Sequence, residues 1–170
     1  MKCFISAALT ADGYIGRNAK HAAMWTGKED KKRFIEITKR AGVVIIGQNT
    51  WFTLGKPLKD RLNIVYSPTP LEPVAGMEVT MKSPADLLAE LESRGFKEVA
   101  ICGGSMIYTM FMKSGLVDTL YLTIEPLLFG DGIKLFKEEL DFKLSLVSSV
   151  QTESGALLLE YRVINSEISK

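Results

Sequence analysis

Asp30 is the acid in this sequence whose position asks most clearly for a chemical explanation. Successive residues of an α-helix turn by about 100°, so in a helix over 28–41 the side chain of Asp30 shares a narrow stripe with apolar residues. These are Phe34, Ile37 and Ala41. A carboxylate facing apolar surroundings is costly unless it is paired or does chemistry. The pattern supports two hypotheses equally. Asp30 pairs with a ligand or a hydroxyl, or it is an acid in the first turn that only interacts favourably with the helix dipole.

The remaining charges of the same helix fall on a different face. Glu29 begins this face, which continues through Arg33, Glu36 and Arg40. We expect this face to be solvated and Glu29 to be a surface acid.

Two apolar runs end in glycine and lead directly into helices. VVIIG (43–47) precedes QNTW (48–51), and VAIC (99–102) precedes GGSMIY (103–108). Glycine allows close approach of the backbone to a ligand, and helix N-termini favour phosphate. For either site alone a simple turn is the better explanation, but the two together support a phosphate-bearing ligand such as a dinucleotide as well as they support two turns. Neither GxGxxG nor GxxxxGK[ST] occurs, so the ordinary Rossmann and P-loop fingerprints are absent.

Composition and charge narrow the function classes. A chain of 170 residues, 46% hydrophobic and 24% charged, fits one domain over residues 1–170. A net charge of +1 argues against nucleic acid and anionic membranes as partners. His21 is the only histidine, and Cys3 and Cys102 are far apart, so we expect neither a metal site nor a disulfide. No signal peptide or apolar run of ~20 residues is visible, so we expect a cytoplasmic protein.

Strand and helix signals alternate along the chain. We expect strands at 3–9, 42–47, 62–67, 98–102 and 119–128, helices at 28–41, 48–55, 83–95 and 106–113, and two antiparallel strands within 144–164. The segment 10–16 is expected to form turn and loop. This order predicts an α/β fold: a twisted, mostly parallel sheet with helices on both faces and a C-terminal antiparallel hairpin. Ligands of such sheets bind beyond the carboxyl ends of the strands.

The terminal hairpin contains the apolar run GALLLEY (155–161). We expect it to be buried in the core, as apolar strands usually are. The alternative is that it covers a partner, which leaves a homodimer open.

The chain resembles the dihydrofolate reductase family from the first strand to the last hairpin. The most specific match is GxxTWxxxGxPLxxRxNIV, from Gly47 to Val65. AALTADGYIG (7–16) is similar to the first strand and mobile loop of the family, and CGGSMIY (102–108) to its Gly-Gly turn, often a cis peptide. Four single residues are similar to a tryptophan, the catalytic acid, a ring-stacking phenylalanine and a threonine that hydrogen-bonds the acid: Trp25, Asp30, Phe34 and Thr123.

The resemblance implies NADPH as the cofactor, lying across the two glycine turns, with Ser67 near the adenosine ribose. The implied cofactor-binding residues are Ala8, Ile15, Gly47, Gln48, Asn49, Thr50, Ser67, Cys102, Gly103, Gly104, Ser105, Met106 and Ile107.

It also implies reduction of 7,8-dihydrofolate, with hydride transfer to the pterin C6 and Asp30-assisted protonation at N5. The implied catalytic residues are Asp30, Trp25 and Thr123. A planar guanidinium at Arg61 would suit the benzoylglutamate carboxylate. The implied substrate-binding residues are Ala8, Asp30, Lys31, Phe34, Leu54, Leu58, Arg61, Cys102, Tyr108 and Thr123.

Three departures keep alternatives open. Gln48 and Met106 stand where many members carry arginines near the cofactor phosphates, so NADH use stays open. Lys31 stands where the family usually has an apolar residue. DGYIG and WTGKED also resemble the reductase domain of riboflavin biosynthesis, which reduces a ribosylaminopyrimidine with NADPH. A third hypothesis is a nucleotide-binding module without catalysis.

Overall fold

One eight-stranded sheet organises the protein, whose structure, a computed structural model, describes residues 1–164. The strand order is β5-β4-β3-β6-β1-β7-β10-β9, and the six strands from β5 to β7 run parallel. Their bounds are β1 (Lys2–Thr10), β3 (Val43–Gly47), β4 (Leu62–Tyr66), β5 (Met77–Thr80), β6 (Glu98–Ile101) and β7 (Thr119–Glu125). The hairpin of β9 (Lys143–Gln151) and β10 (Leu157–Ile164) joins β7 antiparallel, which confirms the predicted fold class.

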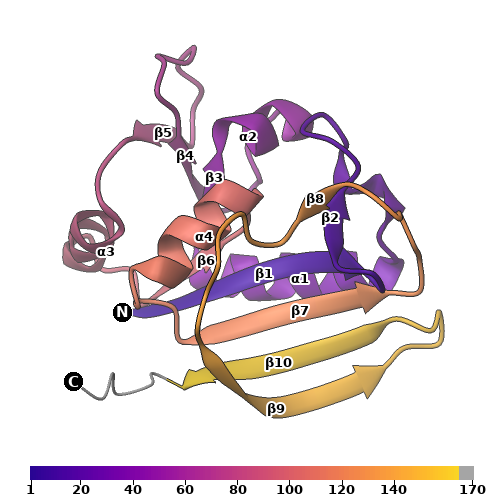
Figure 1. Ribbon diagram of the computed structural model, residues 1–170. Helices are drawn as coiled ribbons and strands as arrows, with labels where there is room; N and C mark the ends of the chain where they lie inside the picture. The colour runs from indigo at the N-terminus through magenta and orange to yellow at the C-terminus, as the bar shows by residue number, and fades with distance from the viewer. Residues whose placement is uncertain (165–170) are drawn as a thin grey trace.

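Helices cover both faces of the parallel part of the sheet. Figure 1 shows α4 (Ser105–Lys113) in front of the sheet and α1 (Lys28–Ala41) behind it. The other helices are α2 (Gln48–Leu54), α3 (Pro84–Ser93) and the short 3-10 turn η1 (Ala23–Trp25). Because α1 and α4 lie on opposite faces, the chain leaves neighbouring strands β1 and β6 in opposite directions, which opens a crevice at their carboxyl ends.

The helix ends follow from local chemistry. Gly42 and Gly55 adopt the left-handed conformation directly after α1 and α2, with φ of 73° and 68°, a conformation that glycine reaches at no steric cost. The hydroxyl of Ser83 accepts the amide of Asp86 and caps α3, with Pro84 in its first turn. These helix boundaries agree with the sequence prediction.

Three short strands were not predicted. β2 (Tyr14–Gly16) lies in the segment expected to be loop and pairs with β8 (Ile133–Lys134), and β5 forms the far edge of the main sheet. Edge strands and two-stranded ribbons bury few side chains, so their sequences lack a clear alternation. β7 is shorter than expected and ends at Glu125, because Pro126 has no amide to continue the ladder.

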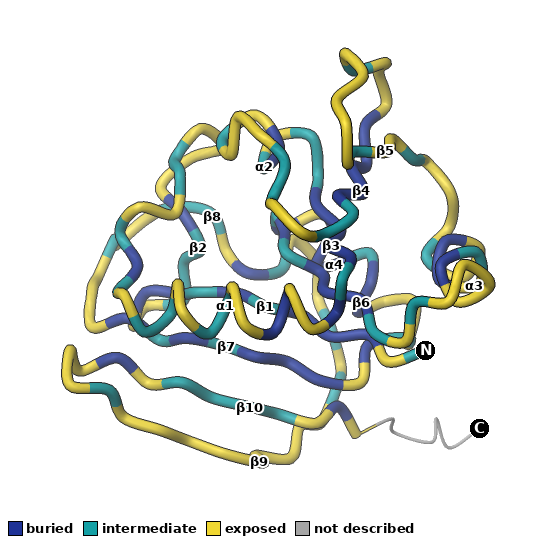
Figure 2. Tube along the Cα trace, turned by 180° about the vertical axis from the view of Figure 1, so that it is seen from behind, coloured by how far each residue is buried: buried dark blue, intermediate teal, exposed yellow. Residues whose placement is uncertain are grey.

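Two expectations about packing were wrong in part. Glu36 and Arg40 are exposed as expected, but Glu29 and Arg33 are half-buried, and the guanidinium of Arg33 lies 5.1 Å from the ring centre of Tyr121. The hairpin is not core throughout, because every residue of β9 is exposed. Figure 2 shows β9 as a continuous exposed strand at the edge of the sheet.

Asn63 fastens the loop between α2 and β4 to the sheet. Its side chain is fully buried, accepts the amide of Leu58 at 2.9 Å, and donates to the carbonyls of Leu58, Arg61 and Gly76 at 3.0, 2.8 and 3.2 Å. One buried amide therefore satisfies four backbone groups and sets the position of the loop that carries Leu58 and Arg61.

We predict that Asn63→Ala lowers the free energy of unfolding by about 2–3 kcal/mol, because it leaves buried backbone groups without partners. Urea denaturation measures this as a lower midpoint at unchanged slope. Asn49→Ala, at an exposed asparagine, is the matched control and should change stability little. Equal midpoints for the two variants would contradict the role given to Asn63.

Candidate active site

The two glycine corners predicted from the sequence touch each other. The amide of Gly47 donates to the carbonyl oxygen of Gly103 at 2.7 Å, and the amide of Cys102 donates to that of Ile45 at 2.8 Å. The peptide bond between Gly103 and Gly104 is cis, as the resemblance suggested. The carboxyl ends of β3 and β6 therefore form one continuous backbone surface.

A side chain at Gly47 or Gly103 would disturb this surface, whereas one at Gly104 would make an ordinary contact. A Cβ on Gly47 would lie 3.1 Å from Cγ1 of Ile107, and one on Gly104 would lie 3.5 Å from the hydroxyl oxygen of Thr50. Gly103 has φ of +109°, and its Cβ would lie 3.1–3.3 Å from the ring and hydroxyl of Tyr108. Glycine is therefore needed for space at Gly47, and for both space and conformation at Gly103.

The start of α4 offers groups that suit a phosphate. Among the described residues, the buried hydroxyl oxygen of Ser105 has no hydrogen-bond partner, and the residue is 4% exposed. It stands at the first position of the helix, where backbone amides are unpaired and the dipole favours negative charge. Met106 follows and is 64% exposed. This corner has the chemistry of an anion site without a cationic side chain.

Two contacts fix the height of Asp30 above the sheet. The amide of Gly27 donates to Oε1 of Glu125 at 2.7 Å, and the guanidinium of Arg33 donates to the carbonyl oxygen of Leu122 at 3.2 Å. Six helical residues rise about 9 Å and three strand residues about 10 Å, so α1 and β7 run side by side in register. Asp30 lies between these two contacts on the part of α1 that runs beside β7.

The inward stripe of α1 ends in the site. Ile37 and Ala41 are buried against the sheet, whereas Phe34 and Asp30 are half-buried. Thr123 is 2% exposed and pairs across the sheet with Ala8. Thr123 faces α1, because Tyr121, two residues before it, belongs to the apolar cluster under that helix. The structure thus pairs Ala8 with Thr123 and turns Thr123 toward the helix that carries Asp30.

Glu125 is a residue of this site that the sequence analysis missed. It is 4% exposed and its carboxylate sits at the N-terminus of α1, where the helix dipole stabilises negative charge. The alternation of Thr119, Tyr121 and Thr123 on one face of β7 carries the signal, because Glu125 continues that alternation. Its hydrogen bond to Gly27 places the first turn of α1, and hence Asp30.

Leu58 and Arg61 lie at the other end of the stripe. Leu58 packs against the cluster beneath α1. The guanidinium of Arg61 donates to the hydroxyl of Thr38 at 2.7 Å and to the carbonyl of Lys59 at 2.9 Å. Within residues 1–164, no carboxylate lies at ion-pair distance from it, since Asp60 pairs with Lys39 at 2.7 Å. A cavity of about 420 Å³ opens beside Arg61, lined also by Lys56 and Lys59.

Arg61 is thus a cation held in place without a counter-ion. Burial lowers the pKa of its guanidinium somewhat, against the opposing effect of Cys102 and Asp60. Eight residues of helix separate Asp30 from Thr38, so the acid and this guanidinium stand about 12 Å apart along α1.

Two uncharged side chains, those of Cys102 and Tyr108, line the site between Asp30 and Arg61. Burial raises the pKa of the Cys102 thiol to about 12. Burial also raises the pKa of the Tyr108 phenol well above its usual range, and negative charge at Cys102 and Asp30 adds to the effect. The Tyr108 hydroxyl donates to the carbonyl oxygen of Ser6 at 2.8 Å. Neither side chain is an acid or base at ordinary pH, so both serve as walls.

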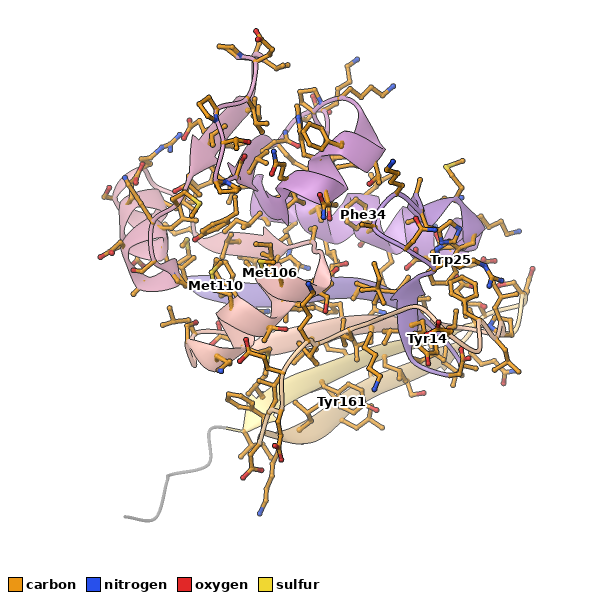
Figure 3. All side chains as sticks on the ribbon, turned by 45° about the horizontal axis from the view of Figure 1, so that its top comes forward. Tyr14, Trp25, Phe34, Met106, Met110 and Tyr161 are labelled. Carbon is orange, nitrogen blue, oxygen red and sulfur yellow. The ribbon has the colours of Figure 1, made fainter. Side chains whose placement is uncertain are left out.

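An aromatic cluster holds the loop that precedes α1. Phe129 packs edge-on against Trp25 with ring centres 5.2 Å apart, and the guanidinium of Arg17 lies 4.2 Å from its ring centre. The indole nitrogen of Trp25 is buried and has no hydrogen-bond partner within the described chain. Figure 3 shows Trp25 and Phe34 on the side of the molecule that carries α1, and Met106 at the start of α4.

Other predicted residues lie further from Asp30. The hydroxyl of Ser67 is buried and donates to the carbonyl of Thr69 at 2.6 Å, and the amide of Gln48 donates to the hydroxyl of Thr69 at 2.9 Å. Ile15 is on β2 and packs against the main core. Four predicted ligand contacts are exposed: Lys31, Asn49, Leu54 and Met106.

Two further findings concern membrane-spanning helices and metal-binding clusters. The helices between residues 1 and 164 include none that is long and apolar enough to cross a membrane. In the same range, no three His, Cys, Asp or Glu side chains gather in a way that could hold a metal ion.

The fold is that of the dihydrofolate reductase-like α/β proteins. A solved structure from Shewanella sp. PV-4, described as a riboflavin biosynthesis protein, superimposes with a TM-score of 0.83 at 23% identity, covering 96% of this chain and 99% of that one. The sequence profile of dihydrofolate reductase matches residues 3–145. The chain therefore belongs to the dihydrofolate reductase family.

Curated relatives are similar over part of their length. The dihydrofolate reductase of Sus scrofa is 36% identical over 129 residues, which are 68% of this chain and 69% of the relative. That of Gallus gallus is 34% identical over 111 residues, which are 61% of this chain and 58% of the relative.

We predict that Glu125→Ala loosens the start of α1, because the Gly27 amide loses its buried acceptor. The expected loss is about 1–3 kcal/mol of unfolding free energy, with much faster hydrogen exchange at the Gly27 amide by NMR. Glu125→Gln retains an acceptor oxygen and should keep most of the protection. If the glutamine variant exchanged as fast as the alanine variant, the hydrogen bond would not be what holds the helix.

Proposed function

We propose that the protein is an NADPH-dependent reductase that converts 7,8-dihydrofolate to tetrahydrofolate. One observation supports the proposal: Asp30 is half-buried on α1, which is fastened to β7 through Glu125 and Leu122, and the neighbouring strands β3 and β6 end in paired glycine corners. An acid on an apolar stripe beside a backbone surface suited to phosphates is the arrangement that a nicotinamide-dependent reductase of a polar heterocycle requires.

The residues at the glycine corners fit a dinucleotide. Gly47, Gly103 and Gly104 leave space that a Cβ would fill, and the unpartnered Ser105 hydroxyl stands at a helix start. These groups would hold the pyrophosphate, and Thr50 and Gln48 would border it at the start of α2. When bound, the cofactor supplies the hydride.

The stripe of α1 would hold the substrate. Phe34 and Leu58 offer apolar walls for a flat ring system, and Asp30 accepts hydrogen bonds from the amino and ring N–H groups of a pterin. About 12 Å further along the helix, Arg61 offers a fixed guanidinium for a carboxylate. The distance between acid and guanidinium would select a ligand with a heterocycle at one end and an anionic group at the other.

Asp30 would also manage the proton that the reduction needs at N5. Its carboxylate would hold the pterin so that N5 faces the open side of the site, and would stabilise the protonated ring or relay a proton through water. Thr123 would bond to the other carboxylate oxygen and keep the acid oriented. Trp25, whose indole N–H is buried and unpaired among the described residues, would bound the site on the loop side.

A second candidate is reduction of a ribosylaminopyrimidine, as in riboflavin biosynthesis. The observation in its favour is that the Shewanella protein matches 96% of this chain, including the hairpin. Here Asp30 would pair with the pyrimidine amide, and Arg61 with a ribosyl phosphate instead of a carboxylate.

The deciding assay follows the absorbance of the reduced nicotinamide with purified protein and each substrate in turn. Turnover of dihydrofolate with NADPH is the expected result, and the same assay with NADH ranks the two cofactors. Turnover of the pyrimidine alone would favour the second candidate. Cofactor binding without turnover of either would leave a nucleotide-binding module.

We predict that Asp30→Asn reduces turnover of dihydrofolate near neutral pH by about 10²-fold or more, because general acid–base assistance contributes on that scale. The fold should survive, since Asp30 is only half-buried. Glu29→Gln is the matched control: it neutralises the preceding acid of the same helical turn, which lies off the inward stripe. Full activity in the Asp30 variant, or equal losses in both, would refute the role of Asp30.

We predict that Arg61→Ala raises the KM for dihydrofolate with little change in kcat, because its cation would bind a part of the substrate that does not react. Arg61→Lys should recover only part of the affinity, since an ammonium lacks the planar fork. Steady-state kinetics with varied dihydrofolate measures both. An unchanged KM in Arg61→Ala would mean that the substrate places no anion there.

A further inference from the structure

One half of the sheet carries an apolar face that no helix covers. In Figure 1, α3 and α4 lie over the part of the sheet formed by β4, β3, β6 and β1, whereas the front of β7, β10 and β9 has no helix. Directly paired residues of neighbouring strands point to the same face. Leu120 of β7 pairs with Tyr161 of β10, which pairs with Leu146 of β9. Leu120 belongs to the core beneath α4, so this row faces the α4 side.

The same register assigns seven large apolar side chains to this surface, which we name the hairpin face. They are Leu122 and Ile124 of β7, Leu157, Leu159 and Tyr161 of β10, and Leu144 and Leu146 of β9. Leu146, Leu144 and Leu157 are 55%, 40% and 38% exposed. Leu122, Ile124 and Tyr161 are partly buried and pack against the core, as do Phe136 and Leu140 of the segment between β8 and β9 that crosses in front of these strands (Figure 1). Figure 3 shows Tyr161 in front of the hairpin.

The opposite side of the same strands is built differently. Glu160 and Arg162 alternate with the hairpin-face residues along β10, and they line a cavity of about 550 Å³ together with Lys2 and Asp118. The charges of the hairpin strands are therefore gathered on one side, and the hairpin face carries none. A soluble antiparallel sheet normally shows its polar side to water and its apolar side to another layer.

We propose that the missing layer is a second copy of this chain, packed hairpin face to hairpin face about a two-fold axis. Two twisted sheets of the same hand pack well on each other, with strands about 30° apart. An uncharged face offers nothing that would select a charged foreign partner, whereas an isologous pair needs only complementarity to itself. The proposal does not depend on the proposed function.

The size of the face fits a modest, reversible dimer. Three strands about 4.8 Å apart and about 30 Å long give roughly 400 Å² of sheet before side-chain relief is counted. This is at the level of the largest apolar patches of single-copy proteins. Counted on both copies and with the relief of the side chains included, the buried area reaches about 1,000 Å², the lower bound of specific interfaces. A dissociation constant in the micromolar range is expected at that size, although area alone does not fix affinity.

Sedimentation velocity across a concentration series of the full chain tests the proposal, with three single variants. Leu146→Lys and Leu157→Lys each place a charge in the hairpin face. Val150→Lys is the matched control: Val150 is on the same strand and is 54% exposed, but it pairs with Leu158 on the opposite face. Circular dichroism melting confirms that each variant folds.

We expect the wild-type chain to pass from monomer to dimer with rising concentration. Both leucine variants should raise the dissociation constant at least tenfold, because each buries an unpaired ammonium, while Val150→Lys should dimerise as the wild type does. A wild type that stays monomeric up to about 100 μM would overturn the proposal. So would dimers in both leucine variants, or dissociation by Val150→Lys as well. Should one leucine variant fail to fold, the other decides.

Discussion

The contact between two backbone corners controls the candidate site. The hydrogen bond from Gly47 to Gly103 joins the ends of the adjacent, parallel strands β3 and β6, and glycine at both positions leaves room for Ile107 and Tyr108. It turns two separate strand-to-helix turns into one surface with two helix starts at its rim. A side chain at either residue would push on Ile107 or Tyr108, which line the first turn of α4. The candidate site thus depends first on glycine at positions 47 and 103, where the lack of a Cβ leaves space that no substitution elsewhere could provide.

The acid of the site depends on a second constraint, the register between α1 and β7. Two contacts along the helix set it: Gly27 to Glu125, and Arg33 to the carbonyl of Leu122, while Arg33 also donates to the carbonyl of Leu159 on β10. A slip by one residue would turn Asp30 by about 100° away from Thr123. Arg33 is half-buried and its pKa is lowered by desolvation, but two backbone carbonyls and an aromatic ring offset that cost. The helix is located by polar contacts at its flank as much as by its apolar stripe.

Periodicity and turn chemistry predicted most of this arrangement from the sequence. The stripe through Asp30, Phe34 and Ile37, the glycine corners and the cap at Ser83 are local signals, readable within a few residues. Glu125 and the buried role of Arg33 could not be predicted, because their partners are 98 and 89 residues away in the chain. A charge pattern at helical spacing says which residues share a face, but not whether that face meets water or a strand edge. The short strands β2, β5 and β8 were missed for the same reason, since only their partners define them.

The hairpin shows how one sheet can separate two tasks. Strand β7 is common to both: Thr123 and Glu125 point to the α1 side and into the candidate site, whereas Leu122 and Ile124 point to the hairpin face. Because side chains alternate along a strand, a layer packed on Leu122 and Ile124 would press on the backbone that carries Thr123 without touching the site. A second copy seated there would stiffen β7 from behind and so hold the acceptor of Gly27 in place. Association at the hairpin face and the placement of Asp30 would then be linked through a single strand.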